Sequence, residues 1–189
     1  ALGGKLLDKD GNQIAFGGGA LKDIESIDLS SLDERLKEVS IEVACDVTNP
    51  LVGEKGASAV FGPQKGATKE IVKELDNNLA HYASVIKKDL GKEVSHIEGS
   101  GAAGGLGAAL LLLGGELKRG IELVIKHTDL AEKVKGADFV FTGEGSIDDQ
   151  TIYGKTPMGV ATVAKENGVS TIAFSGKVGE GIEGLYEIG

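Results

Sequence analysis

The sequence predicts an α/β fold in which helices flank a buried parallel or mixed sheet. Residues 68–90 repeat apolar side chains at three- and four-residue steps, which is typical of an amphipathic helix. "ADFVFTGEG" (137–145) and "VSTIAFSG" (169–176) are short apolar runs that indicate buried strands. Because Thr156-Pro157 can begin a helix between them, these segments predict a βαβ unit, which is usually parallel and right-handed.

Shorter elements are predicted in the rest of the chain. They are a hairpin-like pair of strands in residues 5–16, a short helix after a Ser cap in residues 27–39, a buried strand in residues 41–47 and a fully buried helix in residues 105–113. We expect two lobes in close contact, residues 1–136 and residues 137–189, because "KVKGAD" leads into the βαβ unit. The chain does not begin with Met, so we expect a fragment of a longer protein.

The composition and charge of the chain exclude some classes of function. A formal charge of −9 over 189 residues would repel phosphate backbones, so we expect no nucleic-acid partner. The longest strictly apolar run, "AALLLL", is too short to span a membrane, and no signal peptide is recognisable. Cys45 is the sole cysteine, which favours a reducing compartment and hence the cytoplasm.

The stretch Gly99-Ser100-Gly101-Ala102-Ala103-Gly104 satisfies the G-x-G-x-x-G pattern. One interpretation is a dinucleotide-binding turn, with residues 121–129 as the next strand and Asp129 as the ribose acid. A second is a buried helix entered through close-packed glycines. The third, which we favour, is an anion site at a helix start, where free N–H groups and the helix dipole meet a negative group.

Two further segments carry acidic residues next to predicted strands. Asp46 follows the predicted strand 41–47, where a carboxylate could bind Mg²⁺ or accept a proton from an attacking hydroxyl; the alternative is a turn before Asn49-Pro50. Glu144, Asp148 and Asp149 crowd a glycine turn and predict a hard-cation site or, equally, an acidic loop tip.

Other catalytic patterns are absent or incomplete in the sequence. "YGKTP" (153–157) is not a P-loop because position 149 is Asp, yet Lys155 could still point at a phosphate; the alternative is a solvated Lys before a helix. The three histidines lack zinc-site spacing, and no G-x-S-x-G elbow is present.

Three long segments together resemble the glycerate kinase family, in the family's order. They are "VACDVTNPLVGEKGASAVFGPQKGAT", "GSGAAGGLGAALL" and "ADFVFTGEGSIDDQTIYGKTPMGVA". The resemblance covers nearly the whole chain and implies a two-domain α/β kinase, unrelated to P-loop enzymes, with its site between the domains. Residues 1–136 would then be an inserted domain, and residues 137–189 the start of the return into the other domain.

The resemblance implies that ATP donates its γ-phosphate to a hydroxyl of glycerate, giving 2-phosphoglycerate, with Mg²⁺ present. Asp46 would act as base or as a metal-linked carboxylate, with Lys65 as a catalytic cation. The substrate- or phosphate-binding residues would be Thr48, Asn49, Gly101, Ala102, Gly104, Gly105 and Lys155, and the Mg²⁺ ligands Glu144 and Asp148. The chain departs from the family at Ser146, where Arg is usual, and at Glu98 and Ser100. A homodimer is left open, as are a non-catalytic binding module and, less favoured, a dinucleotide enzyme.

Overall fold

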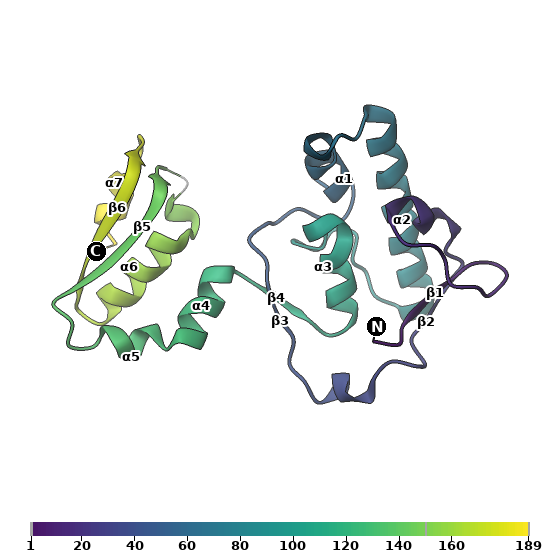
Figure 1. The fold of residues 1–189 in the computed structure, drawn as a ribbon, viewed down its shortest axis with the longest axis horizontal. Helices are drawn as coiled ribbons and strands as arrows, with labels where there is room; N and C mark the ends of the chain where they lie inside the picture. Colours follow the sequence, from purple (N-terminus) through teal and green to yellow (C-terminus); the bar gives the residue numbers. More distant parts are fainter. Residues whose placement is uncertain (1, 150, 189) are drawn as a thin grey trace. The chain divides into compact units, whose positions relative to one another are not determined.

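The computed structural model describes residues 2–149 and 151–188, and the chain divides into two compact units, Ala1–Leu117 and Lys118–Gly189 (Figure 1). The boundary predicted near residues 133–137 lies inside the second unit. The reason is that α4 (Gly120–Thr128) and α5 (Leu130–Val134) both pack against α6 (Thr156–Glu166). The assignment of domains in a longer protein stays a prediction.

The first unit is built around α2 (Lys69–Leu90), which confirms the helix predicted from apolar periodicity. Thr68 caps it, because its hydroxyl accepts a hydrogen bond from the Ile71 amide at 3.3 Å. Gly91 ends it in the left-handed conformation with a φ of 66°. The inner face of α2 supplies five of the twelve buried residues that the structure describes in this core: Leu79, Tyr82, Ala83, Val85 and Ile86.

The N-terminal strands differ from the predicted hairpin. β1 (Lys5–Leu7) pairs antiparallel with β2 (Ser26–Asp28), whereas residues 11–16 contribute only a single bridge between Leu7 and Gln13. Asp8 holds the intervening turn, since its carboxylate accepts the amides of Asp10 and Asn12. The chain then continues into a 3-10 helix, η1 (Gly18–Asp23), that packs on α2. The strand that pairs with β1 follows this helix in the sequence.

The middle of the first unit contains short elements. A 3-10 helix, η2 (Glu34–Lys37), stands where a short helix was predicted, but its cap is Asp33 rather than a serine. β3 (Glu42–Ala44) is shorter and more exposed than the predicted buried strand 41–47, and it pairs with β4 (Glu116–Lys118). The helices that follow are α1 (Ala57–Phe61), η3 (Pro63–Lys65) and α3 (Ala102–Leu112).

The second unit contains the predicted βαβ unit. β5 (Phe139–Ile147) and β6 (Ser170–Val178) are parallel, with Phe139 paired to Ser170 and Ile147 to Val178. α6 connects them, with a proline in its first turn as expected. The last elements are η4 (Thr151–Tyr153) and α7 (Glu183–Tyr186).

The prediction that β5 and β6 are buried is wrong for this chain. Phe139, Phe141 and Phe174 are 54%, 62% and 63% exposed, and the rings of Phe141 and Phe174 stack at 5.9 Å. Exposure alternates along β5 because α6 covers one face of this two-stranded sheet while the other face stays open. Parallel sheets are normally covered on both faces, and for that reason the apolar runs of these two strands predicted that both strands would be buried.

Candidate active site in two groups of residues

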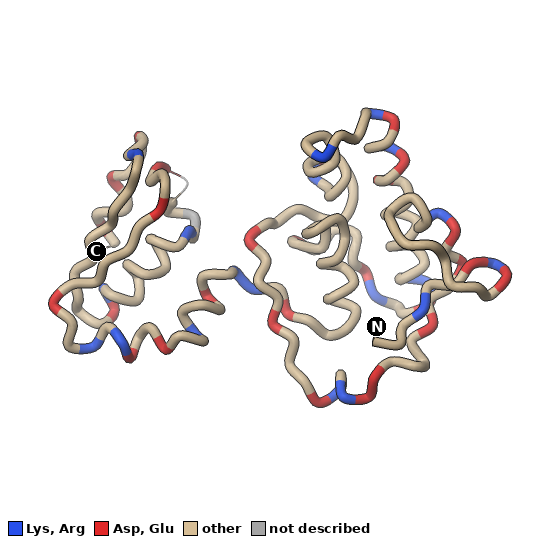
Figure 2. The backbone as a smooth tube through the Cα atoms, in the orientation of Figure 1, with Lys and Arg blue, Asp and Glu red and all other residues tan. Residues whose placement is uncertain are grey.

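The glycine-rich stretch forms a left-handed turn at the start of α3. Ala103, Gly104 and Gly105 have φ values of 50°, 73° and 101°, so regular helix begins only after Gly105. The left-handed conformation costs free energy for any residue that has a side chain, and two of these three residues are glycine. Figure 2 shows no charged residue along α3, but the helix is not fully buried as predicted, because Leu106 is 55% exposed.

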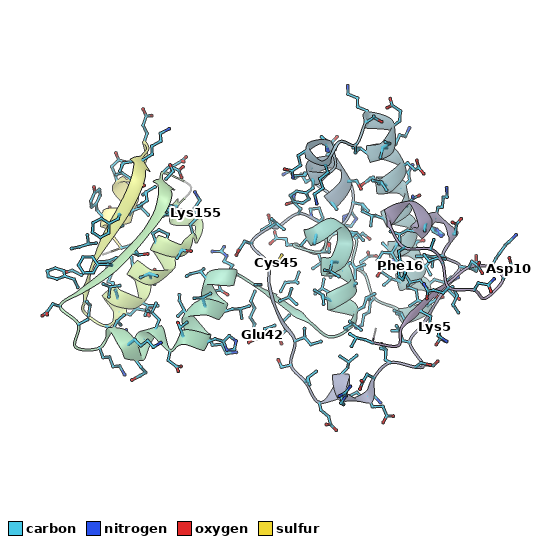
Figure 3. All side chains as sticks on the ribbon, viewed as in Figure 1. Lys5, Asp10, Phe16, Glu42, Cys45 and Lys155 are labelled. Carbon is cyan, nitrogen blue, oxygen red and sulfur yellow. The ribbon has the colours of Figure 1, made fainter. Side chains whose placement is uncertain are left out.

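This turn packs directly onto the segment that follows β3. A Cβ atom on Gly99 would lie 3.0 Å from the sulfur of Cys45, which Figure 3 labels. A Cβ on Gly101 would lie 2.1 Å from the carbonyl oxygen of Pro50, and the Gly101 amide donates to the Asn49 carbonyl at 3.0 Å. The interpretation of close-packed glycines is therefore supported. This packing brings the glycine motif and the Asp-Val-Thr-Asn motif together.

At least three of the four amides predicted to bind an anion already have partners. The amide of Gly101 donates to Asn49, that of Ala102 to the Gly99 carbonyl at 3.0 Å, and that of Gly104 to the Gly101 carbonyl at 3.2 Å. An anion cradle made by Gly101, Ala102, Gly104 and Gly105 stays a prediction. It would require these amides to exchange their present acceptors.

Asp46 and Thr48 lie on one side of an extended segment and are both exposed, while Cys45 and Val47 are partly buried. This alternation is the period-2 pattern of an extended chain, and it directs the Asp46 carboxylate away from the core. Asn49 is already engaged, because its side-chain amide donates to the Lys55 carbonyl at 2.8 Å. Its predicted role in orienting substrate would use the side-chain oxygen or the second N–H of the amide.

The loop after Asn49 is held in place by α2. The Asp76 carboxylate accepts the amide of Gly53 at 3.0 Å, and Gly53 has a φ of 91° that favours glycine. The Ala57 amide returns to the Leu51 carbonyl at 3.2 Å, and Leu51 is fully buried. This anchoring fixes the entry to α1, and with it the turn that carries Lys65.

Lys65 and Gly104 line the same hollow in the first unit. This hollow, named here the α1–α2 hollow, has a volume of about 620 Å³ and is bordered by Val47, Phe61, Lys65, Ile71, Leu75 and Gly104, among others. Lys65 lies at the end of η3, before Gly66 with a φ of 89°. The structure thus brings two predicted site residues, Lys65 and Gly104, to one concave surface. This surface lies beside residues 45–49, which follow β3 and are named here the strand-exit segment.

The second group of predicted residues is organised by Thr151, a residue that sequence reasoning missed. Thr151 is fully buried, and its hydroxyl donates to a Glu144 carboxylate oxygen at 2.8 Å and accepts the Asp148 amide at 3.2 Å. Lys155 lies 3.4 Å from the Asp148 carboxylate and directly precedes α6 (Figure 3). The two predicted metal ligands and the predicted phosphate-binding lysine are therefore linked at the end of β5 and in the loop that leads from it to α6.

Arg119 is a second residue that sequence reasoning missed. A Cβ on Gly154 would lie 2.4 Å from the Arg119 guanidinium, so glycine at 154 gives the arginine room beside Lys155. Gly154 has a φ of 100°, which also favours glycine. At the family's usual arginine position, Ser146 is paired in register with Lys177 of β6, so a cation lies on the neighbouring strand.

The next feature of the described residues is the set of side chains that could bind a metal ion. Among residues 2–149 and 151–188, no three His, Cys, Asp or Glu side chains form a group that could hold a metal ion. Mg²⁺ bound with a nucleotide needs only one or two carboxylates, since phosphate oxygens and water complete its shell. Glu144 and Asp148 fit that smaller requirement.

The dinucleotide interpretation is wrong. A dinucleotide fingerprint needs a strand before the glycines and another after the first helix. Residues 91–97 form no strand, and the residues expected to form the next strand are helical, in α4. Asp129, the expected ribose acid, is instead the left-handed residue between α4 and α5, with a φ of 51°.

No helix in the described part of the chain is both long and apolar enough to cross a membrane.

Fold and site define an α/β protein with a left-handed glycine turn packed on an Asp-bearing segment and with a threonine-centred acidic loop. The chain belongs to the glycerate kinase family, whose model matches residues 1–189. It is 55% identical to a glycerate kinase of Halalkalibacterium halodurans and 53% identical to glycerate 2-kinase of Escherichia coli, over all of this chain and 50% of each relative.

A solved structure agrees with this assignment. A crystal structure from Salmonella typhimurium LT2, which carries the name glycerate kinase 2, matches with a TM-score of 0.85 and 51% identity. That match covers 94% of this chain and 50% of the other. The chain therefore spans about half the length of the relatives it matches.

Proposed function

We propose that the protein containing this chain is an ATP-dependent kinase that phosphorylates glycerate to 2-phosphoglycerate. The observation that carries the proposal is the match of residues 1–189 to the glycerate kinase family, together with 53% identity to a glycerate 2-kinase. The exposed carboxylate of Asp46 beside the glycine turn supplies a group of the kind this reaction needs.

In this reaction the hydroxyl oxygen of glycerate forms a bond to the γ-phosphorus of ATP, and the bond from that phosphorus to the β–γ bridging oxygen breaks. ADP leaves, and the hydroxyl proton passes to a base. Phosphoryl transfer asks a protein mainly to position its reactants and neutralise charge. We assign the base to Asp46, because its carboxylate is exposed and follows β3, where an acceptor can approach it.

The remaining assignments follow the same logic. Thr48 lies on the same exposed side as Asp46 and would orient the acceptor with Asn49, while Lys65 supplies a positive charge at the α1–α2 hollow. Lys155 would contact a phosphate at the start of α6, and Glu144 and Asp148 would hold Mg²⁺, which neutralises phosphate charge when it enters with ATP. We expect the enzyme to work in the cytoplasm.

The test is an ADP-release assay on the full-length protein, coupled to ³¹P NMR of the product. We expect ADP release that depends on both ATP and glycerate, and a product phosphorus signal coupled to the C2 proton. Release without glycerate, or a signal from a 3-phosphorylated product, would contradict the corresponding part of the proposal.

A second candidate applies to the 189-residue chain on its own. Because it spans about half the length of its relatives, it would bind a ligand without turning it over. Calorimetric titration of this chain with ATP and with glycerate, beside the same ADP-release assay, separates binding from catalysis.

A further inference from the structure

The apolar stripe of α2 extends further than the core that covers it. Ile71, Leu75 and Leu79 follow one another at four-residue steps and so share one face of the helix. Leu79 is buried, Leu75 is partly buried, and Ile71 is 43% exposed. The stripe therefore leaves the core and continues along the wall of the α1–α2 hollow, which all three residues line.

The walls of this hollow suit a flat, mostly apolar group. Phe61 and Val47 face the hollow with the α2 stripe, and its volume of about 620 Å³ lies within the range of small-molecule and cofactor sites, about 300–1,000 Å³. An aromatic ring such as Phe61 can stack on a planar base. Glycerate has an oxygen substituent on every carbon, so apolar walls would strip its water without replacing those hydrogen bonds.

The rim of the hollow is polar, in contrast to its apolar walls. Gln64 and Lys65 both line it and are both exposed, and they lie on η3 just before the left-handed Gly66. A Cβ on Gly104, on another part of the lining, would meet nothing within 4 Å, so the rim is open there. An amide and an ammonium group next to an apolar wall complement a molecule that joins a base to a negatively charged phosphate chain.

We propose that the α1–α2 hollow binds the nucleoside part of ATP rather than glycerate, with Lys65 at its rim facing the phosphates. The inference rests on the proposed kinase function, and it assigns one of the two substrates to the first unit. Glycerate would then be held outside this hollow.

The experiment compares Ile71→Asn with Val39→Asn in the full-length protein. Val39 is 53% exposed and does not line the hollow, so it is a matched apolar-to-amide control in the same unit. Both positions are exposed, so neither change is expected to prevent folding. The measurements are the KM for ATP, the KM for glycerate, and the Kd values of ADP and of adenosine by calorimetry.

We expect Ile71→Asn to raise the KM for ATP and the Kd values of ADP and adenosine by about tenfold, as loss of roughly one buried apolar contact would. The KM for glycerate should stay within about twofold, and Val39→Asn should change none of the four. Lys65→Gln should weaken ADP but leave adenosine unchanged, because adenosine has no phosphate.

Other results would overturn the inference in distinguishable ways. A rise in the KM for glycerate alone would place the acceptor in the hollow. No change in any ligand constant, with a lower melting temperature for Ile71→Asn alone, would show that another part of the longer protein or a second copy fills it. If the protein binds ADP as expected but never phosphorylates glycerate, the proposed function fails while the nucleoside site stands.

Discussion

The main chains of Gly101 and Asn49 are joined directly, with the Gly101 amide donating to the Asn49 carbonyl at 3.0 Å. A Cβ on Gly101 would lie 2.1 Å from the neighbouring Pro50 carbonyl oxygen, and backbone cannot move aside as a side chain can. We therefore expect Gly101→Ala to lower the free energy of unfolding by about 1–3 kcal/mol, the usual cost of overpacking. Urea unfolding followed by circular dichroism measures it.

Gly104→Ala is the matched control for that change. A Cβ on Gly104 would meet nothing within 4 Å, but its φ of 73° carries a conformational cost of roughly 1–2 kcal/mol for alanine. The two variants thus separate a clash at ordinary φ from strain without a clash. If Gly101→Ala were as stable as the parent chain, the close backbone contact would be refuted.

Asp46→Asn tests the proposed base. The side-chain amide of asparagine cannot accept the hydroxyl proton, so we expect the kcat of the full-length enzyme to fall at least about a hundredfold. The exposed side of the strand-exit segment should tolerate the change, and the melting temperature should stay within a degree or two. Asp10→Asn, in an exposed turn of the same unit, should leave kcat unchanged. Near-parental turnover of the Asp46 variant would remove the base assignment.

The pKa of Glu93 is lowered to about 2, first by the Ser95 side chain and amide, which both donate to its carboxylate, and further by Lys87. A depressed carboxyl pKa contributes stability that is present above about pH 4.5 and is lost as pH falls through about 2. In a ¹³C NMR titration of the chain, we expect the Glu93 midpoint near 2.

Ser95→Ala provides the comparison for that titration. Removal of the hydroxyl should move the Glu93 midpoint upward, toward 4.5, while Lys87 and the residue 95 amide keep it below that value. The carboxyl of Asp33, whose pKa is lowered by Arg35, should not move. An unshifted Glu93 would show that Ser95 is not its main partner.

Elements with local signals were predictable from the sequence. α2 follows from its apolar periodicity, the Thr68 cap and the left-handed Gly91, all of which lie within one segment. The βαβ connection was predictable for the same reason. The partner of β1 was not, because strand pairing depends on Ser26–Asp28, which lies well beyond the turn. The exposure of β5 and β6 depends on what covers the second face of a sheet, and no strand encodes that locally.

The candidate site shows the same division. Asp46, Lys65, Lys155 and the glycine turn stand out as residue types in short motifs, so the sequence could propose them as candidates. Thr151 and Arg119 did not stand out, because their importance comes from contacts made only after folding, with Glu144 and Gly154. A threonine in a polar loop has no signature that separates a buried hydrogen-bonding centre from a solvated side chain.

Thr151 is therefore the residue in the second unit whose substitution is most informative. Thr151→Val keeps the shape but removes the hydroxyl that joins Glu144 to Asp148, leaving the Glu144 carboxylate oxygen and the partly buried Asp148 amide without that partner. Loss of a hydrogen bond to a charged group costs about 1.5–3 kcal/mol, so we expect the unfolding free energy to fall by that amount. Thr151→Ser keeps the hydroxyl and should restore most of it. Because Lys155 lies 3.4 Å from Asp148 in the same loop, the valine variant of the full-length enzyme should also show a higher KM for ATP. A larger loss in Thr151→Ser than in Thr151→Val would instead assign the effect to packing of the methyl group, which valine keeps and serine lacks.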